Sequence, residues 1–321
     1  MTQPGEGLQG PGAELGRRLR GGDRSAAPAA LNVIEDRSPR GREQASGLLA
    51  EIGPQTRSHL VGLTGPPGAG KSSLLSALLP LWRADGRSVA VLAVDPSSKI
   101  SGGSLLGDRV RIQHDPKDDA VLIRSTAAGA RLGGIAAATR DAAQALTAAF
   151  DVVVVETVGV GQSETDVAEL SDTVVVVVQP ASGDTLQFLK AGIMEVPDVL
   201  VVTKADMGDA AMRARRDLAA ALRTVGASAT PVVAVSSLPP AKGVDELVAA
   251  IDQHRAGLDM NAVRARMRGL AALAAFGAER GERGMRALGG RREAEKLLAS
   301  FGAASPVPEM VAALERAAEH G

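Results

Sequence analysis

Seven short runs of mainly valine, alanine and leucine recur between about residues 58 and 255, and they constrain the fold more than any other feature. The runs are continuous rather than alternating, as in strands that helices cover on both faces of a parallel sheet. Segments rich in alanine and leucine separate them and are long enough for crossover helices. This alternation predicts an α/β fold with a doubly wound, mostly parallel sheet. The runs are HLVGLTG, SVAVLAVD, AVLIRS, DVVVVET, DTVVVVVQ, DVLVVTKAD and PVVAVSS.

The two ends of the chain lack this alternation. Residues 1–30 are rich in Gly, Pro, Ala and Arg and have little apolar periodicity, so we expect them to be flexible. Weak helical spacing from residue 29 to 52, broken at Pro39 and Gly41, predicts one or two helices. The C-terminal part carries no strand signal and predicts helices, interrupted at residues 289–290 and 305–308. We therefore divide the chain into an N-terminal arm (1–56), a central domain (57–256) and a helical extension (257–321). The apolar stripes of this extension need a covering surface, which is either the α/β domain or a second subunit in a dimer.

Composition excludes several classes of protein. The 36 Lys and Arg nearly balance 37 Asp and Glu, so no overall charge favours nucleic acid or an anionic membrane. The chain has no cysteine, which excludes disulfides and thiolate metal sites. Its longest apolar runs are much shorter than the roughly 20 residues of a membrane span, and no N-terminal segment resembles a signal peptide. We expect a soluble cytoplasmic protein.

The sequence GPPGAGKS, residues 65–72, matches the phosphate-binding loop G-x-x-x-x-G-K-[ST] and lies between a predicted strand and a predicted helix. Its glycines let backbone N–H groups approach phosphate oxygens, and the following helix N-terminus favours negative charge. Lys71 would place its charge on the outer phosphates, and Ser72 would offer a hydroxyl to Mg²⁺. A glycine-rich turn between core elements is the alternative, but the flanking elements favour a P-loop. The expected phosphate-binding residues are Gly65, Pro66, Pro67, Gly68, Ala69, Gly70, Lys71, Ser72 and Ser73.

Carboxylates at the ends of two other predicted strands are candidates for a magnesium site. Asp95 ends VLAVD, and Glu156 lies at the end of VVVVET. Mg²⁺ prefers oxygen ligands and keeps several waters, so the contacts can be indirect. Asp108, in the polar segment after Asp95, is either a further ligand or the cap of a turn. The expected metal site is Ser72, Asp95, Asp108 and Glu156, and the expected catalytic residues are Lys71, Glu156 and Asp95.

The segment ETVGVGQSE, residues 156–164, is expected to be a switch. The N–H group of Gly159 is placed to reach a γ-phosphate, which would order the loop. Gln162 is available in the same loop to position the attacking water.

The strand end VVTKAD predicts which base is bound. A carboxylate at Asp206 can accept hydrogen bonds from N1–H and the exocyclic amino group of guanine, whereas adenine has an acceptor at N1 and lacks that amino group. Each hydrogen bond to a charged group is worth about 1.5–3 kcal/mol, so the pair favours guanine several hundredfold. The stem of Lys204 can lie along the base, and backbone N–H groups of Ser236, Ser237 and Leu238 suit the guanine O6. The expected nucleotide is GTP.

Beyond these motifs, the runs VAVLAVDPSSKISGGSLLGDRVRI and VVVVETVGVGQSETDVAELSD resemble the MeaB/ArgK family, over about residues 57–255. Its members are G-protein chaperones of adenosylcobalamin-dependent acyl-CoA mutases and are related to the methylmalonic aciduria type A protein. The resemblance implies a P-loop GTPase domain, GTP/GDP and Mg²⁺ as cofactors, a homodimer, and a methylmalonyl-CoA mutase type of enzyme as partner. It also implies that residues 179–198 form a further switch that responds to the mutase, with Lys190 as its basic position.

The family usually has asparagine where this chain has Thr203. The resemblance therefore implies the loss of an amide that braces a loop, at a cost of about 0.5–1.5 kcal/mol. GTP preference should remain through Asp206.

The resemblance implies slow GTP hydrolysis that gates cofactor loading onto the mutase and removal of damaged cofactor. Three alternatives stay open: a metallochaperone GTPase of the nickel-insertion type, a kinase for a transport protein or small molecule, and a scaffold that binds GDP without turnover. The absence of cysteine and the scatter of four histidines disfavour the first alternative. No acceptor pocket is evident in the sequence for the second.

Overall fold

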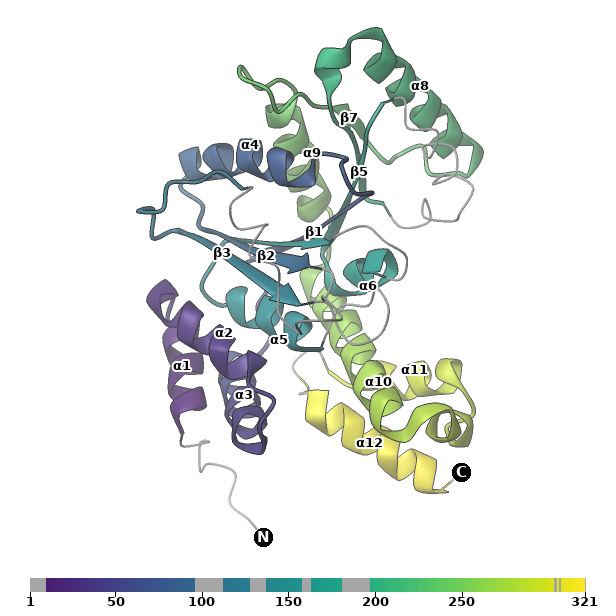
Figure 1. The fold of residues 1–321 in the computed structure, drawn as a ribbon. Coiled ribbons are helices and arrows are strands. Elements are labelled where there is room, and N and C mark those ends of the chain that lie inside the picture. Colours follow the sequence, from purple (N-terminus) through teal and green to yellow (C-terminus); the bar gives the residue numbers. More distant parts are fainter. Residues whose placement is uncertain are drawn as a thin grey trace, which may run out of the picture.

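The computed structural model describes residues 10–95, 112–127, 137–157, 163–180, 197–302, 305 and 307–320. Seven strands pair in parallel into one sheet with the order β3-β2-β4-β1-β5-β6-β7. Each strand falls on one of the seven valine-rich runs, with β3 extending two residues beyond its run, so the predicted fold is confirmed (Figure 1). The strands are β1 (His59–Thr64), β2 (Val89–Asp95), β3 (Val121–Ala127), β4 (Val152–Thr157), β5 (Thr173–Val178), β6 (Val199–Val202) and β7 (Val232–Ala234).

Helices cover both faces of the sheet, which explains why the strands are largely apolar on both faces, with most polar residues near their ends. Val61 and Leu63 of β1 pack in the same cluster as buried side chains of α4 (Lys71–Ala84) and α9 (Val244–Ala256). Leu60 faces the other way, into a cluster that includes residues of α5, α6 and α8. Those helices are Ala137–Leu146, Ser163–Leu170 and Asp209–Thr224. The chain's one tryptophan, Trp82 on α4, is only 1% exposed and therefore reports on this core.

The N-terminal segment is helical from residue 11, so the prediction that residues 1–30 are flexible is wrong for its described part. Helix α1 (Pro11–Arg20) packs against α3 (Pro39–Ile52), with α2 (Ala27–Glu35) beside them (Figure 1). A Cβ on Gly12 would lie 2.0 Å from the Gln44 carbonyl oxygen, and one on Gly16 would lie 2.5 Å from that of Leu48. Glycines let the two backbones approach closely. The buried face of α1 therefore consists mostly of glycine and alanine and carries few of the large apolar residues that usually indicate a packed helix.

Helices α2 and α3 confirm the two helices expected around residues 29–52. Pro39 starts α3 instead of breaking it, because a proline at the first helical position costs no intrahelical hydrogen bond. The Ser38 hydroxyl accepts a 3.0 Å hydrogen bond from the Gly41 N–H and caps this end.

The C-terminal part forms α10 (Met260–Ala287), α11 (Arg291–Ala299) and α12 (Val307–His320). The break between α10 and α11 falls at the predicted residues 289–290, whereas α12 already begins at Val307, within the predicted break at 305–308. The sequence did not predict the kink inside α10 at Gly281, whose φ is 59°. Phe276, Met310 and Leu314 are among the buried side chains of a small core that these helices build together. The apolar stripes of this part are thus largely covered by one another.

A buried ion pair fastens α10 to the sheet. Arg264 Nη1 and Nη2 donate to Oδ1 and Oδ2 of Asp172, just before β5, over 2.6 and 2.8 Å. Asp172 Oδ2 also accepts from the Leu60 N–H over 2.7 Å, and Arg264 Nε donates to the Gln55 carbonyl oxygen over 2.7 Å. Burial raises the pKa of Asp172 and lowers the pKa of Arg264, while each residue opposes the shift in its partner.

A second polar chain crosses the same end of the sheet. His59 Nε2 lies 2.7 Å from Thr173 Oγ1, which lies 2.8 Å from His254 Nδ1, and His254 Nε2 lies 3.2 Å from Asp198 Oδ1. Burial, with the positive charges of Arg255 and its neighbours, lowers the pKa of His59 to about 3. His59 is therefore neutral in the folded protein throughout the physiological range.

This shift predicts a contribution of His59 to acid sensitivity. The folded-state pKa lies below the unfolded value of about 6.5, so the contribution is present above pH 6.5 and is lost as the pH falls. When the pH falls from 7 to 5, protonation of this group in the unfolded state should lower the free energy of unfolding by about 2 kcal/mol. His59→Gln should abolish this part of the pH dependence. Urea unfolding followed by Trp82 fluorescence at both pH values tests this, with exposed His114→Gln as the control. Equal slopes in wild type and His59→Gln would contradict the assignment.

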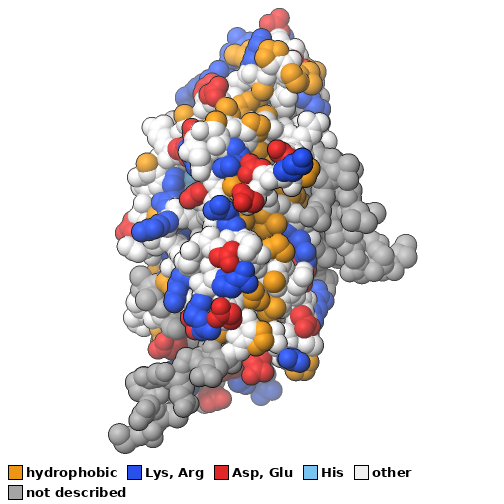
Figure 2. Space-filling view, turned by 90° about the vertical axis from the view of Figure 1, so that its left-hand side faces the viewer, with side chains coloured by type: hydrophobic (Ala, Val, Ile, Leu, Met, Phe, Trp, Pro, Cys, Tyr) orange, Lys and Arg blue, Asp and Glu red, His pale blue; other side chains and the backbone are white. Residues whose placement is uncertain are grey.

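The surface matches the nearly neutral charge of the chain. On the face shown in Figure 2, basic and acidic side chains of the described residues are interspersed. Within the described residues, no helix combines the length and the apolar character that crossing a bilayer demands.

Candidate functional site: a nucleotide-binding loop

The loop at residues 65–70 follows the carboxyl end of β1, between β4 and β5. A Cβ on Gly65, whose φ is 142°, would lie 2.1 Å from the Val177 carbonyl oxygen, so only glycine fits there. Gly68 and Gly70 have φ values of 76° and 90°, which turn the backbone into the start of α4. A Cβ on Gly68 would have no heavy atom within 4 Å, so space is open beside this part of the loop.

The first two residues of α4 bring a cation and a hydroxyl to this loop. Lys71 is 7% exposed, and its Nζ donates to the carbonyl oxygens of Gly65 and Pro66 over 2.6 and 3.1 Å. The ammonium group is therefore held inside the curve of the loop. Ser72 Oγ donates a 2.9 Å hydrogen bond to Glu156 Oε1, at the end of the neighbouring strand β4.

Glu156 and Ser72 form an oxygen-rich pair of the kind that Mg²⁺ prefers. Glu156 is 7% exposed and lies opposite Leu63 in the register of β1 and β4. Next to it, the Thr157 hydroxyl donates to Thr64 Oγ1 over 2.9 Å, which ties the ends of the two strands together. A carboxylate and a hydroxyl oxygen at this separation fit a magnesium ion that also binds phosphate oxygens and water.

Several residues expected in the site cannot be placed. Asp95 ends β2, which pairs with β4, but the position of its side chain lies outside the described structure. The other candidates are outside the described residues altogether: Asp108, Gly159, Gln162 and Lys190.

Thr203, just after β6, stabilises the phosphate-binding loop through a hydrogen bond. Its hydroxyl donates to the Ala69 carbonyl oxygen over 2.6 Å and lies 3.1 Å from that of Val178, and the residue is 2% exposed. The brace expected to be lost with the asparagine amide is therefore supplied by this hydroxyl. A threonine can do this because the hydroxyl of a β-branched side chain is held close to its own backbone.

Removing this hydroxyl should weaken nucleotide binding. Thr203→Val keeps the shape but leaves the Ala69 carbonyl oxygen without this donor, which should lower the unfolding free energy by about 1 kcal/mol and GDP affinity about 5–10-fold. Calorimetric titration with GDP and urea unfolding measure the two effects. Thr224→Val is the matched control, because the Thr224 hydroxyl donates to the Ala221 carbonyl oxygen at an exposed site. An unchanged GDP affinity in Thr203→Val would argue against the brace.

The segments expected to bind guanine lie together. Ser236 Oγ donates to Asp206 Oδ1 over 2.9 Å, which orients the carboxylate. The Leu238 N–H lies 3.4 Å from the same hydroxyl oxygen, and the Leu238 side chain is 61% exposed, which leaves a large apolar surface beside Asp206. Ser237 lies between the two in the chain.

Lys204 adopts a backbone conformation that is rare outside glycine. Its φ and ψ are 54° and 41°, and it is the one residue other than glycine with positive φ among those described. Its Nζ donates to Gln179 Oε1, so the side chain runs from the end of β6 toward the end of β5. The sequence analysis included Gln179 only in the expected switch at residues 179–198 and did not predict this contact, although a polar residue directly after a buried strand was the available signal.

Known proteins match this chain in sequence and in structure. The family model of the methylmalonyl-CoA mutase-associated GTPase MeaB matches residues 27–276. A putative GTPase of Pyrococcus abyssi is 42% identical over 254 residues, which are 77% of this chain and 76% of that protein. GTPase ArgK of Escherichia coli is 44% identical over 196 residues, 60% of this chain and 59% of that protein.

A solved structure agrees over nearly the whole chain. The crystal structure of a LAO/AO transport system kinase matches with a TM-score of 0.65 and 28% identity, covering 99% of both chains. The phosphate-binding loop, its carboxylate partner and the base-side cluster therefore occur on a fold already seen in a relative. The chain belongs to the family of methylmalonyl-CoA mutase-associated GTPases, MeaB, and is a GTPase.

Proposed function

We propose that this GTPase acts as a chaperone of an adenosylcobalamin-dependent acyl-CoA mutase, gating cofactor loading and protecting or reactivating the mutase. The family match, whose description includes association with methylmalonyl-CoA mutase, supports this partner. The observation that carries the nucleotide part is the loop itself, with Lys71 inside its curve and Ser72 bonded to Glu156. A homodimer is the proposed assembly.

Each residue of the loop has a proposed role in hydrolysis. Backbone N–H groups of residues 68–73 would bind the phosphates, and Lys71 would turn its ammonium group to the outer phosphate oxygens as negative charge develops. Ser72, with Glu156 and Asp95, would hold Mg²⁺ directly or through water. The ion would neutralise charge on the β- and γ-phosphate oxygens.

Asp206 is the proposed reader of guanine. Asp206→Asn keeps the shape and one acceptor but replaces the other oxygen with a donor, which would face the exocyclic amino group of guanine. GTP affinity should fall about 10–100-fold, because a hydrogen bond to a charged group is lost. Affinity for xanthosine triphosphate should rise, because xanthine offers a carbonyl oxygen at that position. Titration with both nucleotides is the measurement, with Asp209→Asn at the start of α8 as control, and unchanged selectivity would refute this role.

The mutase role is tested by steady-state GTP hydrolysis with and without a purified adenosylcobalamin-dependent acyl-CoA mutase. We expect the mutase to raise the turnover number at least tenfold by completing the site. Loading of adenosylcobalamin onto the apo-mutase should in turn depend on GTP. No change in either rate, with several mutases of this class, would exclude the proposed role while leaving GTP hydrolysis intact.

A kinase for a transport protein is the second candidate, since the solved relative carries that name. The two reactions differ in the acceptor of the γ-phosphoryl group. Label from γ-labelled GTP should appear as inorganic phosphate if water is the acceptor and on a protein if the kinase reading holds.

A further inference from the structure

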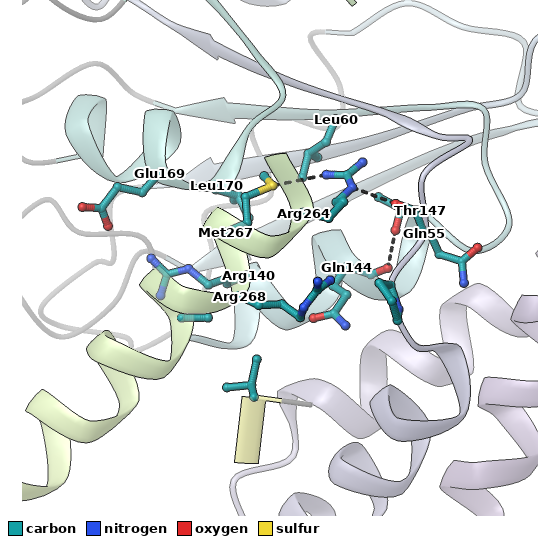
Figure 3. A pocket seen from close by; sticks show the side chains of 13 residues that line it. Gln55, Leu60, Arg140, Gln144, Thr147, Glu169, Leu170, Arg264, Met267 and Arg268 are labelled. Atoms are coloured by element: carbon teal, nitrogen blue, oxygen red, sulfur yellow. Dashed lines mark hydrogen bonds between the residues drawn. The ribbon is translucent and has the colours of Figure 1, made fainter. Parts of the chain in front are cut away.

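A pocket lies at the opposite end of the sheet from the nucleotide loop. Leu60 at the start of β1, Leu170 at the end of α6 and Met267 on α10 are among its lining residues, and Gln55 closes it near the end of α3. Figure 3 shows that its side chains come from α5, α6, α10 and the segment that follows α3. None of these residues belongs to the GTP site described above.

Arg268 in this pocket is buried without a partner. The residue is 9% exposed, and its Nε and one of its terminal nitrogens have no hydrogen-bond partner. Arg264, one helical turn earlier, is by contrast fully engaged by Asp172 and backbone carbonyl oxygens. Burial and the neighbouring charge of Arg264 lower the pKa of Arg268. A buried cation that lacks a counter-ion is costly, so its retention needs another reason.

Two polar side chains of α5 line the pocket with Arg268. Arg140 and Gln144 lie four residues apart on α5 and therefore on the same helix face. The Arg268 side chain extends toward Gln144 (Figure 3). Among the described lining residues the one carboxylate is Glu169, and it already lies 3.5 Å from Arg291 Nη2. The pocket thus combines cationic donors with few competing anions.

The remaining walls of the pocket are apolar, and this favours binding of some anions over others. Leu60, Leu170, Met267, Ala271 and Val307 line the pocket beside the arginines. Inorganic phosphate would leave these walls without a partner, whereas a carboxylate with a short hydrocarbon chain would satisfy both kinds of surface. We propose that this pocket binds a small aliphatic carboxylate, whose oxygens pair with Arg268 and Arg140 and whose chain contacts the apolar walls.

Calorimetric titration of the full chain with acetate, propionate, butyrate and hexanoate tests the proposal. GDP and Mg²⁺ are present at saturation, so that the phosphate-binding loop is occupied and cannot take up the probe. Butyramide, a neutral molecule of the same shape, and inorganic phosphate are titrated in parallel. We expect at least one carboxylate to bind with a Kd of about 0.1–1 mM, and butyramide and phosphate at least tenfold more weakly.

Arg268→Met separates this pocket from other anion sites. It should weaken carboxylate binding more than tenfold while raising the melting temperature of the carboxylate-free protein by about 2–4 °C, because a buried unpaired charge is removed. Arg266→Met, an exposed arginine on the same helix, should change neither quantity. Arg140→Met, at a half-buried position, should also weaken binding and serves if Arg268→Met folds poorly.

Three results would overturn the proposal. The first is that no carboxylate binds at a concentration 20-fold above the expected Kd. The second is that butyramide or phosphate binds as tightly as butyrate, and the third is that both arginine variants keep the carboxylate affinity of wild type. GTP hydrolysis is measured independently, so failure here leaves the GTPase assignment untouched.

Discussion

Lys71→Ala is expected to lower the turnover number for GTP hydrolysis about 10²–10³-fold, the cost of losing one positioned charge at a developing phosphoryl charge. Lys71 is 7% exposed and its Nζ lies against the Gly65 and Pro66 carbonyl oxygens, so no other described cation is held inside this loop. Alanine can supply neither the charge nor the hydrogen bonds. Single-turnover hydrolysis of GTP at saturating nucleotide measures the chemical step without a contribution from weaker binding.

Two controls connect this loss to the phosphate site. Lys117→Ala removes an exposed lysine outside the loop and should leave the turnover number unchanged. Unfolding of Lys71→Ala in urea, followed by Trp82 fluorescence, should show an intact core, since the Lys71 ammonium group contacts carbonyl oxygens of the loop and the apolar residues of α4 are unchanged. A Lys71→Ala protein that hydrolyses GTP within threefold of wild type would exclude the proposed role of this lysine.

The fold and the phosphate loop were predictable because their physical signals are local in the sequence. Continuous valine runs have few uses other than strands covered on both faces, and all seven became strands of one sheet. The loop at residues 65–72 needs glycines at fixed offsets, since Gly65 leaves no room for a Cβ and Gly68 and Gly70 have positive φ. Such requirements are visible in one sequence without knowledge of distant contacts.

Features that depend on packing between distant segments were not predictable. The glycines of α1 suggest a flexible segment until Gln44 and Leu48 are seen against them. Arg264 and Arg268 look like the solvated face of a helix, yet both are at most 9% exposed. Because Arg264 and Arg268 are four residues apart, they must lie on the same face of the helix. The spacing does not show whether that face packs against the protein or is exposed to solvent.

Arg264→Ala is expected to lower the free energy of unfolding by about 3–5 kcal/mol, the usual cost of breaking a buried ion pair by removing one partner. The Asp172 side chain is 0% exposed and would be left with the Leu60 N–H as its remaining hydrogen-bond donor. The same substitution also removes the hydrogen bonds to the Gln55 and Ser58 carbonyl oxygens. Urea unfolding at pH 7.5, followed by Trp82 fluorescence and by circular dichroism for the helices, measures the loss.

The pH dependence of this variant distinguishes a stranded charge from lost packing. Burial already raises the pKa of Asp172, and removing Arg264 should raise it further. A carboxyl group whose folded-state pKa lies above its unfolded value favours the folded state most below the unfolded pKa, and this contribution is lost as the pH rises through the folded pKa. The deficit of Arg264→Ala should therefore be largest at neutral pH and shrink toward pH 4. Arg266→Ala, exposed on the same helix, should cost less than about 0.5 kcal/mol at every pH.

The double variant Arg264→Met with Asp172→Asn removes both charges of the buried ion pair. Asparagine keeps an acceptor for the Leu60 N–H, and methionine fills part of the space of the arginine stem without a charge. If charge stranding dominates, the double variant should be more stable than Arg264→Ala, even though it carries two substitutions. Its stability relative to wild type should also change less between pH 4 and 7.5 than that of Arg264→Ala. A deficit that is the same in both proteins and flat with pH would mean that α10 is held by the backbone hydrogen bonds of Arg264 and not by the ion pair.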